Sequence, residues 1–282
     1  MGISIVTDST CDLPLDLIQK HGISVVPMYI MTPGGELRDG IDLSRQEFYE
    51  KLSEYKPHPT TAAPSTEYFK RVYENLAQKG ATEIISIHIS RKLSAVVDIA
   101  TQSAKETTVV PVTVFDSRQL SLGTGFEVIT AAESVKKGQS VEEILRVLDD
   151  QIKRTHVFAA LDTLEFLRRS GRMNFALSFL GSLLRIKPFL KMYDGNPTAE
   201  RVRTREKAMK RLVELLKEAA PLERAALLYS RAKDRAEELL ENVKPLLPEG
   251  NILVEEINPV LGTHIGPGVI GFACISKKKT WE

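Results

Sequence analysis

The sequence predicts an α/β protein with two domains, and three observations lead to this. At 282 residues the chain is longer than most single domains. In its first half, continuously apolar strand-like segments alternate with helical ones, which is typical of a largely parallel sheet covered by helices on both faces. In its second half, the turn at 194–197 predicts a hairpin, so antiparallel pairing enters. We place a soft boundary near residue 155, giving an N-terminal α/β domain (1–155) and a C-terminal mixed α/β domain (156–282).

The elements of the first half follow one another at short intervals. Pro14 lies in the first turn of the first helix and Gly22 just after its end, the usual asymmetry of helix ends. Ser44 and Glu47 fit a capping box that opens the second helix, and Ser140 and Glu143 fit another. The expected strands are 3–6, 23–30, 83–89 and 109–115, and further helices are expected at 65–79, 93–105 and 121–137.

The second half changes character after a strand at 156–161. Two short helices come next, and then the two strands of the hairpin, 186–193 and 198–203. The remaining expected helices are 206–219 and 232–243, and the remaining strands are 225–230, 252–257 and 268–275.

The composition excludes several classes of protein. A formal charge of +1 argues against an electrostatic grip on nucleic acid or on an acidic membrane. The only two cysteines, Cys11 and Cys274, lie in apolar sequence, so we expect reduced, buried thiols and no disulfide framework. The start of the sequence lacks a signal-peptide pattern, and the most apolar stretch, 175–184, is shorter than the ~20 residues that span a bilayer. We expect a cytoplasmic protein that is not an integral membrane protein.

Polar loops follow the predicted strands. Because the carboxyl ends of parallel strands meet at one edge of a sheet, these loops are expected to converge on one crevice. Their hydroxyl groups and the free N–H groups of the helices that follow suit a small anion, a carboxylate or a phosphate. Ser, Thr and Asp before helices are also ordinary N-caps, so both interpretations stand for each loop. The loops are 7–10, 60–65, 90–94, 116–121 and 262–268.

Motifs of common enzymes are missing. The sequence has no Walker-type phosphate loop, no G-x-G-x-x-G after its first strand and no G-x-S-x-G elbow. Its five histidines show no metal-binding spacing, so we expect no metal and no cofactor. His264 lies between glycines and a proline, a setting that can expose a side chain, and it is either functional or structural.

Together, these segments resemble the DegV family. The opening Thr-Asp-Ser-Thr-Cys-Asp-Leu-Pro at 7–14 is similar to the family's first motif. The segments that resemble its other motifs are Asp116-Ser117 with Ser121, Gly123 and Gly125, then 163–172, Lys187-Pro188 and 262–268. The resemblance covers nearly the whole chain in the right order.

The resemblance implies a carrier that holds a long-chain fatty acid, such as palmitate, between two domains. Thr61 and Ser94 would bind the carboxyl group, with His264 and Arg172 in the surrounding polar network. Some members present the acid to a separate ATP-binding kinase subunit, which makes an acyl phosphate, so we expect no catalytic residue in the chain itself. This sequence departs from the family where Ala62, Ala63, Ala95 and Val96 replace its usual residues, either removing donors from the head-group site or changing only the packing around it.

A fatty-acid tail requires an apolar tunnel. The segment 175–184 is apolar nearly all round, and Phe175, Phe179, Leu180 and Leu183 are the candidates for lining the tunnel. The same segment could equally be core between the domains.

Two other functions stay open. The first is an independent hydrolase or phosphotransferase that uses Asp8, Asp116 and His264 for acid–base chemistry. The second is a carrier for another amphiphile, with no kinase involved. Residues 201–217 form a basic stretch, which is either a solvated helix face or a docking surface for the kinase subunit or for its nucleotide phosphates.

Overall fold

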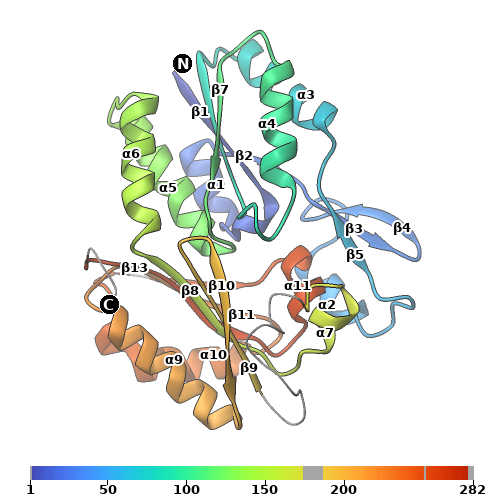
Figure 1. Ribbon diagram of the computed structural model, residues 1–282, viewed down its shortest axis with the longest axis vertical. Helices are drawn as coiled ribbons and strands as arrows, with labels where there is room; N and C mark the ends of the chain where they lie inside the picture. Colours follow the sequence, from blue (N-terminus) through green and yellow to red (C-terminus); the bar gives the residue numbers. More distant parts are fainter. Residues whose placement is uncertain (1, 174–186, 251, 279–282) are drawn as a thin grey trace.

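The computed structural model describes residues 2–173, 187–250 and 252–278. Over these ranges the chain forms a parallel sheet, a larger mixed sheet and a small antiparallel sheet, with helices packed against them (Figure 1). The predicted two-domain α/β class is confirmed. Antiparallel pairing also occurs in the first half of the chain, in the small sheet, which was not predicted. The boundary near residue 155 stays a prediction.

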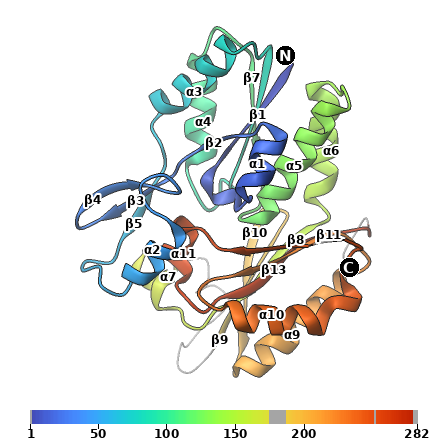
Figure 2. The same cartoon turned by 180° about the vertical axis from the view of Figure 1, so that it is seen from behind.

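The first sheet is parallel, with the strand order β2-β1-β6-β7. Its strands are β1 (Ile3–Asp8), β2 (Ser24–Val26), β6 (Glu83–His88) and β7 (Val112–Asp116). Helices cover both faces, which is why apolar residues occur on both faces of these strands (Figures 1 and 2). On one face lie α3 (Thr66–Gln78) and α4 (Val96–Glu106); on the other lie α1 (Leu15–His21), α5 (Leu122–Lys136) and α6 (Val141–Ile152).

The single strand predicted at 23–30 is wrong. The chain leaves the parallel sheet after β2, and Pro27 separates β2 from β3 (Tyr29–Thr32), which belongs to another sheet. Proline has no N–H group to continue a ladder, so the strand breaks there. The small antiparallel sheet has the order β4-β3-β5 and includes β4 (Gly35–Arg38) and β5 (Thr60–Ala62). The capping box at Ser44 opens α2 (Arg45–Lys51) as predicted.

The larger sheet has the order β10-β9-β8-β13-β11-β12 and is antiparallel except between β11 and β12. Its strands are β8 (Thr155–Ala160), β9 (Lys187–Tyr193), β10 (Asn196–Val202), β11 (Leu222–Tyr229), β12 (Leu253–Glu256) and β13 (Ile270–Ser276). The predicted hairpin is the β9–β10 pair. On the face away from the parallel sheet lie α9 (Arg205–Ala219) and α10 (Lys233–Val243) (Figure 1). The first sheet and its helices stand on the opposite face.

The segment expected to be a glycine-rich loop at 262–268 is partly helical. It begins inside α11 (Pro259–Ile265), whose N-cap Asn258 accepts the Leu261 N–H at 2.9 Å. Gly262 allows this helix to pack closely, since a Cβ there would lie 2.5 Å from the Tyr49 hydroxyl. Gly266 ends the helix with φ of 71°, a conformation that glycine adopts readily.

A buried aspartate ties α11 to the first sheet. Asp12 Oδ1 accepts the backbone N–H of Asn258 at 2.9 Å, and Asp12 Oδ2 accepts the Ser121 hydroxyl at 2.6 Å. The Arg45 guanidinium lies 3.3 Å from the same carboxylate and neutralises it. Each of these partners donates to Asp12, so the position of α11 is fixed by a satisfied buried charge.

Of the two short helices predicted after β8, the first is α7 (Glu165–Arg169). The second falls within 174–186, outside the described residues. None of the helices in the described ranges is both long and apolar enough to cross a bilayer. Cys11 and Cys274 are buried free thiols, and burial raises the pKa of each to about 12.

Candidate functional site

A cavity of about 330 Å³ lies where the three sheets approach one another. Loops at the carboxyl end of the parallel sheet, β5, the inner face of the larger sheet and α11 all contribute to its wall. Most of the wall is aliphatic, as at Leu120, Val157, Leu190, Met192 and Val260. Its volume is within the ~300–1,000 Å³ of small-molecule sites.

One part of the wall is polar. The four residues predicted for a head-group site all line this cavity: Thr61 from β5, Ser94 before α4, Arg172 after α7 and His264 from α11. Thr61 Oγ1 and His264 Nε2 lie 2.9 Å apart, which is hydrogen-bond distance. The Ser94 hydroxyl has no hydrogen bond to any part of the chain that the structure describes, so it is available to a ligand. Arg172 is half-buried and brings the positive charge.

The His264 imidazole is neutral at pH 7. Burial and, to a smaller extent, the positive charge of Arg172 lower the pKa of His264 to about 4. When its proton is on Nε2, the ring donates to Thr61 Oγ1, and the Thr61 hydroxyl is then free to donate to a ligand oxygen. The arrangement is suited to accepting an anionic oxygen at the corner of an apolar cavity.

Most of the other predicted hydroxyl groups serve the fold. The Thr10 hydroxyl and the Thr10 N–H both donate to Asp8, and the Ser121 hydroxyl donates to Asp12, although Thr10 and Ser121 also line the cavity. Ser65 is the N-cap of α3. Of the two interpretations of these loops, capping therefore accounts for most hydroxyls. Among the hydroxyls of the predicted loops, those of Thr61 and Ser94 line the cavity without serving a cap or a buried carboxylate.

The residues that depart from the family pattern lie at the same corner. Ala62, Ala63 and Ala95 line the cavity, and Val96 is fully buried. Ala95 is the N-cap of α4 and, having no side-chain oxygen, leaves the first N–H groups of that helix without a side-chain cap. This helix end therefore presents a partial positive charge beside Ser94.

The acid–base set of the enzyme alternative is not assembled. Asp8 is fully buried and accepts from His88 Nδ1 at 3.0 Å and from the Ile89 N–H at 3.1 Å. Asp116 accepts the backbone N–H groups of Arg91 and Arg118. His264 pairs with Thr61 instead, so the three predicted groups have separate partners and share no hydrogen bond. Among the described residues, no cluster of three metal-ligating side chains occurs.

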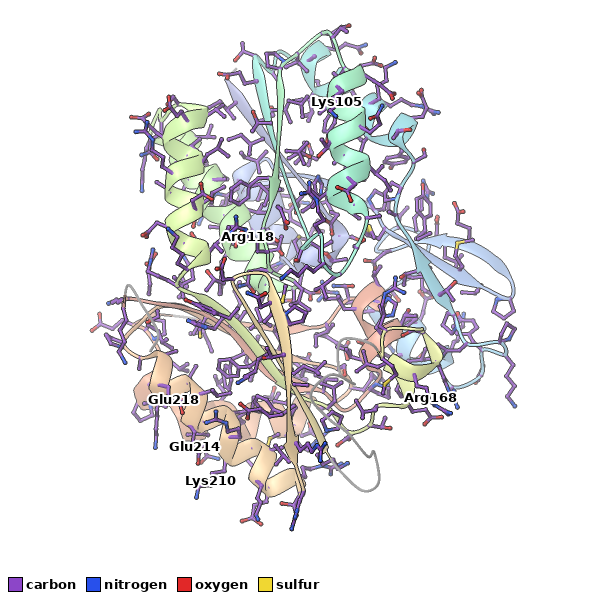
Figure 3. The ribbon with its side chains drawn as sticks, viewed as in Figure 1. Lys105, Arg118, Arg168, Lys210, Glu214 and Glu218 are labelled. Atoms are coloured by element: carbon purple, nitrogen blue, oxygen red, sulfur yellow. The ribbon has the colours of Figure 1, made fainter. Side chains whose placement is uncertain are left out.

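The apolar candidates Phe175, Phe179, Leu180 and Leu183 lie outside the described residues. The basic stretch 201–217 is partly neutralised within the chain. Arg211 pairs with Glu200 at 3.0 Å and Glu218 at 3.0 Å, and Arg205 pairs with Asp162 at 3.0 Å. Figure 3 shows Lys210, Glu214 and Glu218 along the outer side of α9, so acidic residues share this face with the basic ones.

His58 was not among the predicted site residues. Its Nε2 lies 2.9 Å from the carbonyl oxygen of Thr263, one residue before His264. Spacing in the sequence gave no indication of this contact, because the two residues are 205 positions apart. The one local signal is Pro59, because a proline disfavours the helical conformation of the residue before it.

Comparisons with known proteins bear on the whole chain. Residues 2–277 match the model of the DegV family, described as uncharacterised protein. A DegV domain-containing protein of Streptomyces coelicolor is 34% identical over 280 residues, covering 98% of this chain and 99% of that protein. A fatty-acid-binding DegV family protein from Thermus thermophilus has a solved structure with 38% identity and a TM-score of 0.88, covering 98% of this chain and all of that one. DegV of Bacillus subtilis, a fatty acid binding protein, shows 31% identity and a TM-score of 0.89, with 98% and 100% of the chains covered.

Proposed function

This chain belongs to the DegV family, and from this premise we propose that it carries one long-chain fatty acid, such as palmitate, held by its carboxyl group. The observation that carries the proposal is the apolar cavity whose polar corner is formed by Thr61, Ser94, Arg172 and His264. The fatty-acid binding of its relatives from Thermus thermophilus and Bacillus subtilis supports the same ligand class.

The tail supplies most of the binding free energy. Burying about 15 carbons at ~0.8 kcal/mol each gives ~12 kcal/mol before the entropic cost of association. The aliphatic wall formed by residues such as Leu120, Leu190 and Met192 provides the surface for this burial. The four aromatic and leucine candidates at 175–183 are proposed to extend it.

The head group fixes the orientation of the ligand. A carboxylate that is removed from water without partners costs several kcal/mol. Hydrogen bonds from Thr61 and Ser94, the charge of Arg172 and the uncapped N–H groups of α4 would together offset that penalty, at about 1.5–3 kcal/mol for each bond to a charged group. A ligand with a neutral head group would leave Arg172 uncompensated.

The same corner is poorly suited to catalysis by the chain alone. A hydroxyl beside an imidazole resembles a nucleophile and its base. His264 is a weak base, because burial holds its pKa at about 4, and its Nδ1 has no partner within the described ranges to orient it. We therefore assign Thr61 and His264 to binding.

A titration with palmitate and with 1-hexadecanol tests the proposal. The Thr61→Ala/Ser94→Ala variant should bind palmitate at least ~10-fold more weakly than the wild type does. Both proteins should bind the alcohol weakly and with similar affinity. Thr198→Ala is the matched control, because Thr198 also lines the cavity but lies on β10. Unchanged palmitate affinity in the double variant would reject the head-group site.

We further propose that the bound acid is presented to an ATP-binding kinase subunit. In that reaction a carboxylate oxygen attacks the γ-phosphorus of ATP, forming an acyl phosphate and releasing ADP. The carrier would supply the orientation of the carboxylate and exclude water from the tail. No group of the chain has to accept a proton, because the attacking carboxylate is already ionised.

A basic surface near the cavity is the proposed docking site. By register, Arg201 pairs with Pro188 and shares its face of the hairpin with the cavity-lining Leu190. Arg203 follows on the same side, and neither arginine has an ion pair with the described part of the chain. Arg168, exposed on α7, points outward (Figure 3). A kinase subunit would meet this side of the molecule when it reaches the carboxyl group.

Charge reversal tests the docking site. Arg201→Glu/Arg203→Glu should weaken binding of a purified fatty acid kinase subunit, and the loss should shrink at high salt. Lys210→Glu/Lys217→Glu on α9 is the matched control, since it makes the same charge change on another face. Equal kinase binding by both variants would reject docking at Arg201 and Arg203.

A further inference from the structure

We infer that His58 is a positioning residue of the head-group site. It does not line the cavity, and it acts through the end of α11 to set the distance between Thr61 and His264. This inference rests on the proposed function, because the site it adjusts is the one assigned to the carboxyl group.

The hydrogen-bond partner of His58 determines which ring nitrogen carries a proton. Nε2 lies 2.9 Å from the Thr263 carbonyl oxygen, and a carbonyl oxygen can only accept, so Nε2 carries a proton and donates. His58 Nδ1 is buried and finds no partner among the described residues. The single hydrogen bond of the ring is thus directed at α11.

This bond satisfies a carbonyl group at the end of a helix. The carbonyl groups in the last turn of a helix have no N–H partner within it. In α11 the Gly262 carbonyl accepts the Gly266 N–H at 2.8 Å. The Thr263 carbonyl receives its donor from His58. Because His264 follows Thr263 directly, a shift of this carbonyl would move the imidazole that faces Thr61.

Packing holds the same end of α11 from a second side. The His58 ring lies 5.7 Å from the Phe166 ring, centroid to centroid, and a Cβ at Gly266 would lie 2.1 Å from Phe166. The C-terminal turn of α11 is therefore held between His58 and α7. His58 comes from the short segment that leads into β5, so one residue connects the two elements that bear Thr61 and His264.

The backbone of His58 is restricted before any contact forms. Pro59 is buried, and a residue before proline is held away from the helical region. The ring is thus presented to α11 at low entropic cost, as expected for a residue that sets a distance.

A double-mutant cycle with palmitate tests the inference. His58→Phe keeps the ring but loses the donor, and we expect ~5-fold weaker palmitate binding. His58→Gln places an amide donor near the position of Nε2 and should bind within ~2-fold of the wild type. In a Thr61→Val background, His58→Phe should change affinity less than ~2-fold, because the contact it sets is already gone.

A ligand-free measurement makes the test independent of lipid binding. In delipidated protein, His58→Phe should shift the ¹⁵N resonance of His264 Nε2, as Thr61→Val does, and His58→Gln should leave it unchanged. Asn, whose amide is too short to reach Thr263, replaces Phe if that variant does not fold. Equal 5-fold losses from His58→Phe in both backgrounds, or an unmoved His264 resonance, would overturn the positioning role. Failure of the wild type to bind palmitate would instead reject the carrier proposal.

Discussion

Thr61 Oγ1 lies 2.9 Å from His264 Nε2, although 203 positions separate the two residues. The contact joins β5 of the small antiparallel sheet to α11, which follows β12 of the larger sheet. It closes the polar corner of the cavity, so the head-group site depends on the relative placement of elements from both halves of the chain.

Because His264 is neutral in the folded protein, acid should lower the free energy of unfolding. With a pKa of about 4 in the fold and about 6.5 when unfolded, His264 takes up a proton first in the unfolded chain. The stability that the neutral imidazole contributes is fully present above pH 6.5. It is lost as the pH falls towards 4, which lowers the free energy of unfolding by up to about 3 kcal/mol. His264→Gln should remove this part of the pH dependence, as measured by urea unfolding at pH 7, 6, 5 and 4.5. Parallel pH curves for the two proteins would contradict the prediction.

Asp39 should act in the opposite direction. Burial raises the pKa of Asp39 to about 7, and the Ser9 hydroxyl at 2.6 Å is its hydrogen-bond partner. The folded protein therefore holds this proton more tightly than the unfolded chain, and stability falls as the pH rises from about 4 to 7. Asp39→Asn should be more stable than the wild type at pH 8, by up to about 4 kcal/mol, with the difference vanishing near pH 4. Urea unfolding at the two pH values measures this, and a variant that is less stable at pH 8 would refute it.

A buried series of hydrogen bonds joins α3, β6 and β1 and should contribute to the stability of the fold. Tyr73 donates to Ser86 at 2.9 Å, Ser86 lies 2.7 Å from His88 Nε2, and His88 Nδ1 lies 3.0 Å from Asp8. Burial alone would raise the pKa of Asp8, but its bond to His88 and the other donors lower it, so the carboxylate is charged. His88→Phe leaves that charge without its partner and should cost about 3–5 kcal/mol.

Tyr73→Phe is the matched control for this prediction. It removes only the neutral hydrogen bond from Tyr73 to Ser86, and this should lower the free energy of unfolding by about 1 kcal/mol. Urea unfolding of the two variants gives the comparison. A His88→Phe variant no less stable than Tyr73→Phe would show that Asp8 does not rely on His88.

Gly266 is required for two reasons that can be separated. Its φ of 71° disfavours any other residue, and a Cβ there would overlap Phe166. Gly138 has φ of 76° with open space around it, so Gly138→Ala should show the backbone effect alone, about 1 kcal/mol. Gly266→Ala should destabilise by about 3 kcal/mol, because its ψ of −174° places it in a region essentially restricted to glycine and overpacking against Phe166 adds to this. Equal thermal unfolding midpoints for the two variants would rule out a steric role for Phe166.

Much of the fold could be predicted from the sequence because local signals agree with it. The apolar segments of the first sheet and the caps at Ser44 and Ser140 mark their elements directly. The break at Pro27 was not anticipated, since the apolar pattern continues through it. Which sheet a short strand such as β5 joins is decided by contacts distant in sequence, and no local pattern contains that information.

For the candidate site, the family motifs were more informative than the local residue patterns. Family motifs pointed to Thr61, Ser94, Arg172 and His264, and the fold brings all four to one cavity. Sequence alone could not separate hydroxyls that serve a ligand from those of Thr10 and Ser121, which bind buried carboxylates. The distinction depends on which carboxylates the fold buries beside them.

The lipid content of the purified protein tests the central claim most directly. The protein is denatured, extracted and analysed by mass spectrometry, with the Thr61→Ala/Ser94→Ala variant prepared in parallel. The account predicts one long-chain fatty acid per chain in the wild type and a clear loss in the double variant. A wild-type protein that contains no fatty acid and binds none when palmitate is added, or one that carries another amphiphile in its place, would contradict it.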